Sequence, residues 1–235
     1  MSRNHNGLDK AGTLGAALGA VLLATRVAAA ADAKLLVFLH VAVKQRALQS
    51  ELSAALPGID VTAVGRVADF ERALTEGQDA VLSLPPVLKA HNLAAKLQGT
   101  RQGSSEEKYS LIAVDTAPDA ARCAVVGTLD LLGRDGTNEF VHTLTGSKPK
   151  VERVTKVEDL LPLLQMRRVD AILLPSRLFT EIRAASRLNL VGRELPSAVG
   201  LPAAANVGAM GAHVLAQLAK LPKGLSKAFG VEEWR

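Results

Sequence analysis

Hydrophobic positions fall into two alternating patterns from residue 34 onward. A continuous apolar run at 35–39 is typical of a strand that is covered on both faces, and further strands are expected at 59–64 and 79–84. Between these strands, segments 43–56 and 67–74 place apolar side chains at helical spacing. Strands that alternate with helices in this way predict a parallel sheet with crossover helices.

A second alternating block follows a polar interruption. Residues 98–108 hold two Gly, two Ser and several charged side chains, which predicts a loop. Further strands are expected at 109–114, 122–126, 151–154 and 169–174, and further helices at 137–144 and 157–164. Residues 127–136 are expected to be irregular, and Thr155 with Glu158 has the spacing of a capping box.

The two blocks resemble each other internally. Residues 67–88 and 157–178 each open on Val-x-Asp, continue as an amphipathic helix and reach a strand that begins Asp-Ala. Any helix-to-strand unit can look like this, and the other interpretation is a pair of similar lobes. We adopt the second interpretation and predict an α/β fold of two similar lobes joined by a double-crossover hinge, which closes around a ligand. The predicted first lobe comprises residues 34–116 plus 197–235, and the predicted second lobe comprises 117–196.

The first 33 residues have the pattern of a secretory signal peptide. Arg3 and Lys10 lie in a polar start, an apolar stretch covers 11–24, and small residues that suit signal peptidase follow at 28–31. The apolar stretch is shorter than the roughly 20 residues that span a bilayer. An uncleaved anchor is the alternative, and Arg26 argues against it. We therefore expect an exported protein, most simply a periplasmic one.

Composition removes several classes of function. The chain has one Cys, which excludes an intramolecular disulfide and a Cys-rich zinc site. Its net charge is +5, no Lys/Arg run reaches five, and there is one Trp and one Tyr, so we expect no nucleic-acid partner. The motifs of zinc peptidases, P-loop proteins and serine hydrolases do not occur. We therefore expect a protein that is not an enzyme and needs no cofactor or metal.

The chain resembles the type II periplasmic substrate-binding proteins, and most nearly the phosphate/phosphonate-type binding components of ABC transporters. The stretches that carry the resemblance are DAVLSLPPVL, VVGTLDLLGRDGTNEFVHTLTG, KPKVERVTKVEDLLPLLQMRRVDAILLP and AFGVEEW. The chain is short for that class. It has a single hydroxyl, on Thr128, in the 127–130 turn where phosphonate binders carry several.

The resemblance implies a monomer that captures a small-molecule anion, phosphate- or phosphonate-like, and delivers it to an ABC transporter permease. Two alternatives remain open. One is a periplasmic sensor or accessory domain, in which closure of the lobes signals to a protein partner. The other is an enzyme on the same fold.

Candidate ligand contacts follow from the rule that open parallel sheets bind ligands at the carboxyl ends of their strands. Helix N-termini at that edge offer free N–H groups and a positive dipole end to an anion, and an arginine there adds a bidentate contact. The predicted ligand-binding residues are His40, Ser83, Thr128, Arg134, Thr137, Asn138, Ser176 and Arg177. Thr137 and Ser176 also suit helix caps, and the two arginines also suit a solvated surface.

Overall fold

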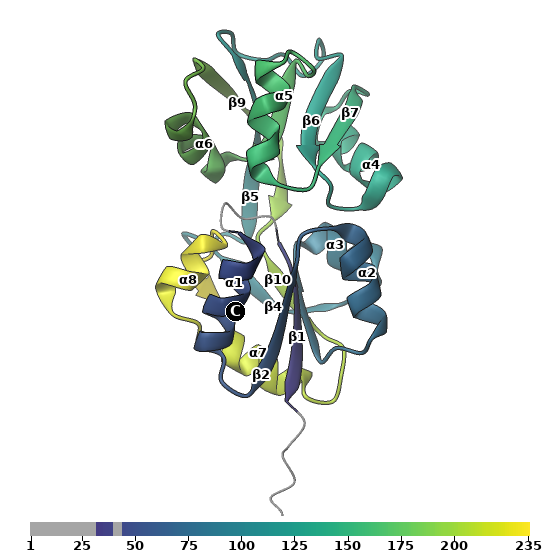
Figure 1. Ribbon diagram of the computed structural model, residues 1–235, viewed down its shortest axis with the longest axis vertical. Helices are drawn as coiled ribbons and strands as arrows, with labels where there is room; N and C mark the ends of the chain where they lie inside the picture. The colour runs from purple at the N-terminus through teal and green to yellow at the C-terminus, as the bar shows by residue number, and fades with distance from the viewer. Residues whose placement is uncertain (1–31, 40–43) are drawn as a thin grey trace, which may run out of the picture. The chain divides into compact units, whose positions relative to one another are not determined.

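The computed structural model describes residues 32–39 and 44–235, which form two mixed sheets with flanking helices (Figure 1). The first sheet has the order β11-β4-β10-β3-β1-β2 and the second has the order β7-β6-β8-β5-β9. The strands of the first sheet are β1 (Ala33–Phe38), β2 (Ile59–Val64), β3 (Ala80–Ser83), β4 (Ala95–Thr100), β10 (Ala203–Asn206) and β11 (Glu233–Trp234). Those of the second are β5 (Glu106–Val114), β6 (Val125–Leu129), β7 (Lys150–Val154), β8 (Ala171–Pro175) and β9 (Leu190–Gly200).

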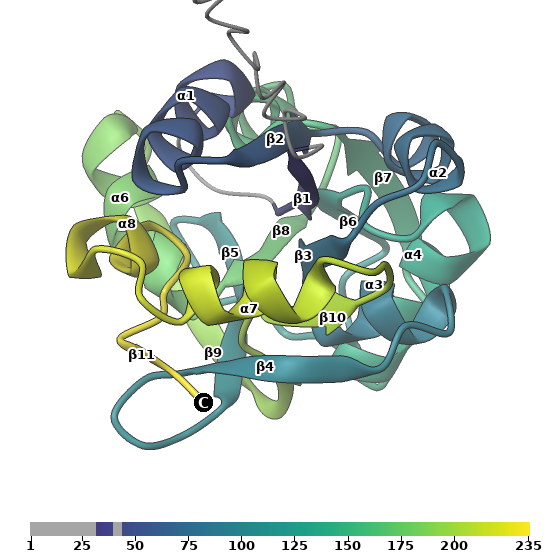
Figure 2. The same ribbon diagram turned by 90° about the horizontal axis from the view of Figure 1, so that it is seen from below.

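Helices cover both sheets, as crossover connections between parallel strands require (Figures 1 and 2). The helices beside the first sheet are α1 (Gln45–Ala55), α2 (Val67–Thr75), α3 (Pro85–Ala90), α7 (Gly211–Leu218) and α8 (Lys223–Ala228). Those beside the second are α4 (Gly133–Thr145), α5 (Leu160–Gln165) and α6 (Phe179–Ala185), with short 3-10 turns η1 (Val157–Asp159) and η2 (Ser176–Leu178).

The two sheets repeat one arrangement. Each contains a β-α-β-α-β unit whose first strand pairs in parallel with both of the others, β1 with β2 and β3, and β6 with β7 and β8. In each, the third strand of the unit also pairs with an antiparallel strand that directly follows a crossing between the sheets, β10 in the first and β5 in the second. The prediction of two similar α/β lobes is therefore confirmed.

The crossings between the sheets differ from the predicted ones. β5, which falls within the predicted first lobe, pairs with β8 and β9 in the second sheet. The chain crosses at 101–105, where Arg101 and Ser104 form a bridge, and returns at 201–202. The predicted loop at 98–108 was wrong at both ends, because β4 runs to Thr100 and β5 begins at Glu106. The polar residues 106–108 form a strand here because their backbone pairs with residues 198–200 of β9, and Glu107 is buried with an arginine partner.

Local predictions in the second block also need correction. The predicted irregular segment begins with strand β6, in which Gly127 permits close packing, since a Cβ there would lie 3.2 Å from Leu163 of α5. Helix α4 begins at Gly133, four residues before the predicted start at 137. The predicted capping box does not form, because Lys156 is the N-cap and no side chain caps the turn.

Three apolar clusters hold the described residues together. One includes residues of both sheets, with Phe38 stacked on Phe70 at 5.0 Å between ring centroids. The other two lie under α1 and α7 in the first sheet and under α5 and α6 in the second. Burying each Leu or Phe contributes about 1.5–3 kcal/mol, so both sheets have a core of their own.

The predicted signal peptide falls almost wholly within residues 1–31, outside the described part of the chain, and stays a prediction. Within the described ranges, no helix combines the length and the apolar character that crossing a bilayer needs.

Candidate functional site

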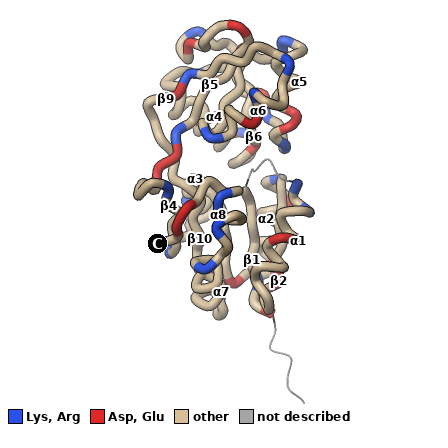
Figure 3. The backbone as a smooth tube through the Cα atoms, turned by 90° about the vertical axis from the view of Figure 1, so that its left-hand side faces the viewer, with Lys and Arg blue, Asp and Glu red and all other residues tan. Residues whose placement is uncertain are grey.

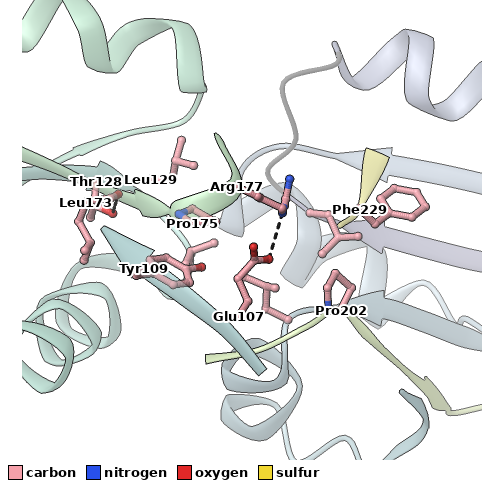
Figure 4. A pocket seen from close by; sticks show the side chains of 12 residues that line it. Glu107, Tyr109, Thr128, Leu129, Leu173, Pro175, Arg177, Pro202 and Phe229 are labelled. Carbon is pink, nitrogen blue, oxygen red and sulfur yellow. Dashed lines mark hydrogen bonds and ion pairs between the residues drawn. The ribbon is translucent and has the colours of Figure 1, made fainter. Parts of the chain in front are cut away.

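A small cavity lies where the carboxyl ends of parallel strands from both sheets meet. Leu39 and Leu84 directly follow β1 and β3, and Leu129 and Pro175 end β6 and β8; all four line the cavity. Its volume is about 20 Å³, which is room for one water molecule. This is the edge at which open parallel sheets bind ligands. Most of the lining is apolar, and the polar side chains are those of Glu107, Tyr109, Thr128 and Arg177 (Figure 4).

Glu107 and Arg177 form a buried ion pair on this cavity. Tyr109 pairs with Pro175 in the antiparallel β5–β8 ladder, so two residues further along the same register Glu107 lies opposite Arg177. The Nε of Arg177 donates to Oε2 of Glu107 at 3.0 Å. The side chain of Arg177 is only 15% exposed and that of Glu107 only 3%, so water screens the pair weakly.

The remaining polar atoms of this pair are available. Oε1 of Glu107 is buried without a hydrogen bond, and its nearest cation is Nη1 of Arg101 at 3.8 Å. Within the described residues, Arg177 donates its only hydrogen bond through Nε, so both Nη groups are left to other acceptors. Two parallel N–H donors of this kind match the geometry of a carboxylate or a phosphate.

Gly230 shapes the space around Arg177. It follows α8 with a φ of +78°, and a Cβ built on it would lie 2.7 Å from Nε of Arg177. Only glycine therefore lets the guanidinium lie against this turn of the C-terminal segment. Since Arg177 follows β8 of the second sheet and Gly230 precedes β11 of the first, the contact joins the two lobes.

Tyr109 adds a neutral hydroxyl to the lining. Burial raises the pKa of Tyr109 well above its ordinary value, and the Glu107 carboxylate raises it further while Arg177 opposes them. Its ring meets Phe140 edge to face at 5.6 Å. Tyr109 is therefore protonated at every physiological pH and can donate a hydrogen bond.

Two of the predicted site residues, Thr128 and Arg177, line the cavity. The hydroxyl of Thr128 donates to the Leu173 carbonyl at 3.1 Å and so links β6 to β8. Ser83 is buried, and its hydroxyl donates to the Phe38 carbonyl at 2.7 Å. These two hydroxyls fasten neighbouring strands to each other and have no donor left for a ligand.

The other predicted residues that the structure describes lie apart from the cavity lining. The hydroxyl of Ser176 is bonded to that of Ser110 at 2.8 Å. Thr137 is buried and donates to Asp130 at 3.0 Å, while Arg134 is exposed and Asn138 half-buried on the same helix. His40 lies outside the described residues. Because α4 begins early, Arg134 lies inside the helix and not in the predicted loop, while Thr137 and Asn138 lie in a helix as predicted.

Sequence reasoning missed Glu107, Tyr109 and Arg101 as site residues. All three fall in or next to the segment that was predicted to be a polar loop. The structure marks two of them by an alternation along β5, in which Glu106 is exposed, Glu107 buried, Lys108 half-buried and Tyr109 buried. No group of three or more His, Cys, Asp or Glu side chains within 32–39 and 44–235 is arranged to hold a metal ion.

Comparison with known proteins defines the fold. No profile of a known protein family and no curated protein matches this sequence. Solved structures do match: the BvgS VFT2 domain of Bordetella pertussis superposes with a TM-score of 0.55 at 13% identity, covering 84% of this chain and 91% of that one. Holo ArgBP of T. maritima gives 0.53 at 15% identity, covering 83% and 89%. The GluR0 ligand-binding core in complex with L-glutamate gives 0.55 at 13% identity, covering 84% and 96%.

These likenesses establish the class of fold. The chain has the two-lobed α/β fold of type II periplasmic binding proteins, as its topology indicates. The likenesses do not extend to the phosphate/phosphonate type that the sequence resembled, and at this level of identity they concern the fold alone.

Proposed function

We propose that this chain is an exported binding protein that captures a small anionic solute between its two lobes and delivers it to an ABC transporter. One observation carries the proposal. Arg177 lies at the carboxyl end of β8, held through Nε by Glu107, and its two Nη groups are left for an acceptor at the cavity. The proposed mechanism is a ligand-induced shift of the lobes toward a closed state.

The charges around Arg177 favour a singly charged acid group. Arg101 and Arg177 bring two positive charges, and Glu107 brings one negative charge within 4 Å of both. A carboxylate would balance the cluster, whereas a doubly charged phosphate or phosphonate would be repelled by Glu107. Two of the structural neighbours, ArgBP and the GluR0 core with L-glutamate, carry amino-acid names, which supports a carboxylate over the phosphate-like ligand expected from sequence.

A periplasmic sensor or accessory domain is the second candidate. The observation in its favour is the size of the cavity, because about 20 Å³ admits one water and no solute until the lobes move apart. A domain of this kind would transmit closure to a protein partner. The likeness to a BvgS VFT2 domain supports this candidate. A pull-down from envelope extract that retains a protein partner, together with no response to any ligand, would favour it over the binding protein.

Export is the remaining part of the proposal. The polar start, the short apolar stretch and the Ala-x-Ala sites support a cleavable signal peptide. Ala33 is buried and pairs with Ile59, so we expect cleavage after Ala31, which leaves β1 whole. Intact-mass measurement of the protein from a periplasmic fraction tests this, and a full-length mass would contradict it.

A ligand screen tests the binding function. The processed protein is heated with carboxylates, amino acids, phosphate, phosphonates and sulfate. A ligand at about 100 times its dissociation constant adds about 2.7 kcal/mol, which shifts the melting temperature by roughly 5–10 °C. We expect carboxylates to give the shift and Arg177→Gln to abolish it.

Arg134→Gln is the matched control, because Arg134 is an exposed arginine that does not line the cavity. Loss of the shift in this variant, with Arg177→Gln unaffected, would move the site to α4. No shift with any compound would overturn the proposal and leave the sensor candidate.

A further inference from the structure

A second, larger hollow adjoins the site at Arg177. Arg177, Leu178 and Glu181 form its wall on the second lobe, and Lys223, Lys227, Ala228 and residues 230–233 form its wall on the first, with Arg101 beside them. Its volume is about 800 Å³, compared with about 20 Å³ for the inner cavity. Arg177 lines both the inner cavity and this larger hollow, which we call the groove. The rest of a ligand whose acid group binds the Nη atoms of Arg177 can therefore lie in the groove.

The groove has positive charge that the described residues do not neutralise. Lys223 and Lys227 are four residues apart on α8, which places them on one helix face, and Figure 3 shows basic positions along this helix. Both are exposed, and neither forms an ion pair within the described residues. Two charged ends therefore border the groove, the guanidinium of Arg177 and the ammonium pair of α8.

The acids of the groove are mostly committed to other partners. The carboxylate of Glu232 accepts a hydrogen bond from the Gln102 backbone N–H at 2.9 Å. Glu233 pairs with Arg235 at 3.0 Å. Glu181, on the wall opposite α8, is the acid that remains without a partner among the described residues. The balance of uncommitted charge along the α8 wall is positive.

Building on the proposed function, we infer that the solute is elongated and carries a second acid group. The first acid group binds the Nη atoms of Arg177, the body lies along the groove, and the second acid group reaches Lys223 and Lys227. The ligand class is a linear molecule with an acid at each end. The lysines then act as length-measuring residues, because a short molecule held at Arg177 does not reach them.

Calorimetric titration of paired ligands tests this inference. Each linear dicarboxylate of about four to ten carbons is compared with the monocarboxylate of the same length at low salt. Two exposed charge contacts are worth about fivefold to twentyfold in affinity together, so a dicarboxylate should bind tighter by that factor above one threshold length. Added salt should reduce the preference.

Variants locate the second contact. The double variant Lys223→Gln/Lys227→Gln should lose the preference for dicarboxylates while it binds monocarboxylates as before. Lys220→Gln is the matched control, since Lys220 is an exposed lysine near α8 that does not line the groove. It should keep the preference in full.

The outcomes separate the two proposals. Equal binding of monocarboxylates and dicarboxylates at every length, lost in Arg177→Gln, would overturn the second contact and leave the proposed function standing. A preference that survives in the double variant, or that disappears equally in Lys220→Gln, would also overturn it. No binding of either series would overturn the proposed function and this inference with it.

Discussion

The two lobes share a motif and differ at the end of it. Asp79 and Asp170 directly precede strands β3 and β8, and each accepts hydrogen bonds from two backbone N–H groups. The carboxylate of Asp79 accepts the backbone N–H groups of Lys34 and Met210, and that of Asp170 accepts those of Ala124 and Val125. Each aspartate thus holds the start of the strand in the middle of its three parallel strands, β1 or β6.

The far ends of the same strands diverge. In the first lobe, β3 leads into Pro85 and Pro86, which begin α3. In the second, β8 leads through Pro175 and Ser176 to Arg177, which reaches the cavity. The shared part of the repeat builds the sheet, and the part that differs supplies the charge. The resemblance between the lobes therefore indicates the fold, and the difference between them contains the candidate site.

Removing the partner of Arg177 should give the largest effect. Glu107→Gln keeps the size of the side chain but leaves a buried guanidinium without its carboxylate. Breaking a buried pair from one side costs several kcal/mol, and Arg177 is partly exposed, so we expect a loss of about 3 kcal/mol in the free energy of unfolding. Urea denaturation measures it.

Glu106→Gln is the control for this variant, since Glu106 is the adjacent, exposed residue of β5 and has no ion pair within the described residues. It should change stability by less than about 0.5 kcal/mol. Equal effects of the two variants would mean that the ion pair contributes nothing, and the contrast between the lobes would then lie in packing alone.

Gly230→Ala should have the next largest effect. The residue has a φ of +78°, and the new Cβ would meet Nε of Arg177 at 2.7 Å. The backbone conformation alone costs about 1–2 kcal/mol, and displacement of Arg177 adds to it. We expect a loss of about 2 kcal/mol by urea denaturation, together with weaker binding of any ligand that Arg177 holds.

Gly224→Ala provides the comparison at a second glycine of the same region. It lies in α8 with open space around its Cβ position. Alanine favours a helix over glycine by about 1 kcal/mol, so this variant should be neutral or more stable. A destabilised Gly224→Ala, or an unaffected Gly230→Ala, would contradict the contact between Gly230 and Arg177.

The fold was largely predictable because it depends on apolar spacing, which local sequence carries. Mostly apolar segments such as 35–39 and 79–84 become strands because helices cover both of their faces. The resemblance between residues 67–88 and 157–178 then indicates the second lobe. Arg177 was a candidate from the sequence because it comes two residues after the end of β8, at the edge where open sheets bind ligands. Glu107 was not, since its burial depends on Arg177, which is 70 residues away in the sequence. Arg134 was placed in a loop because nothing local shows that the helix begins at Gly133.

The smallest effect tests the shared half of the repeat. Asp79→Asn and Asp170→Asn each remove the charge from a carboxylate that accepts two backbone N–H groups. Charged hydrogen bonds are worth about 1.5–3 kcal/mol when buried, and these are partly solvated, so we expect about 1 kcal/mol for each variant. Asp60→Asn, at an exposed position of β2, should cost almost nothing.

The pH dependence of the Asp79 variant sharpens the comparison. The hydrogen bond from the Lys34 N–H, and then that from Met210, hold the pKa of Asp79 below its ordinary value in the folded protein. A lowered folded-state pKa stabilises the protein above the unfolded pKa of about 3.9, and this contribution disappears as the pH falls through the folded value. The stability gap between the wild type and Asp79→Asn should therefore be constant above pH of about 5 and close below pH of about 4. A gap that persists in acid would mean that Asp79 acts through its shape and not through its charge.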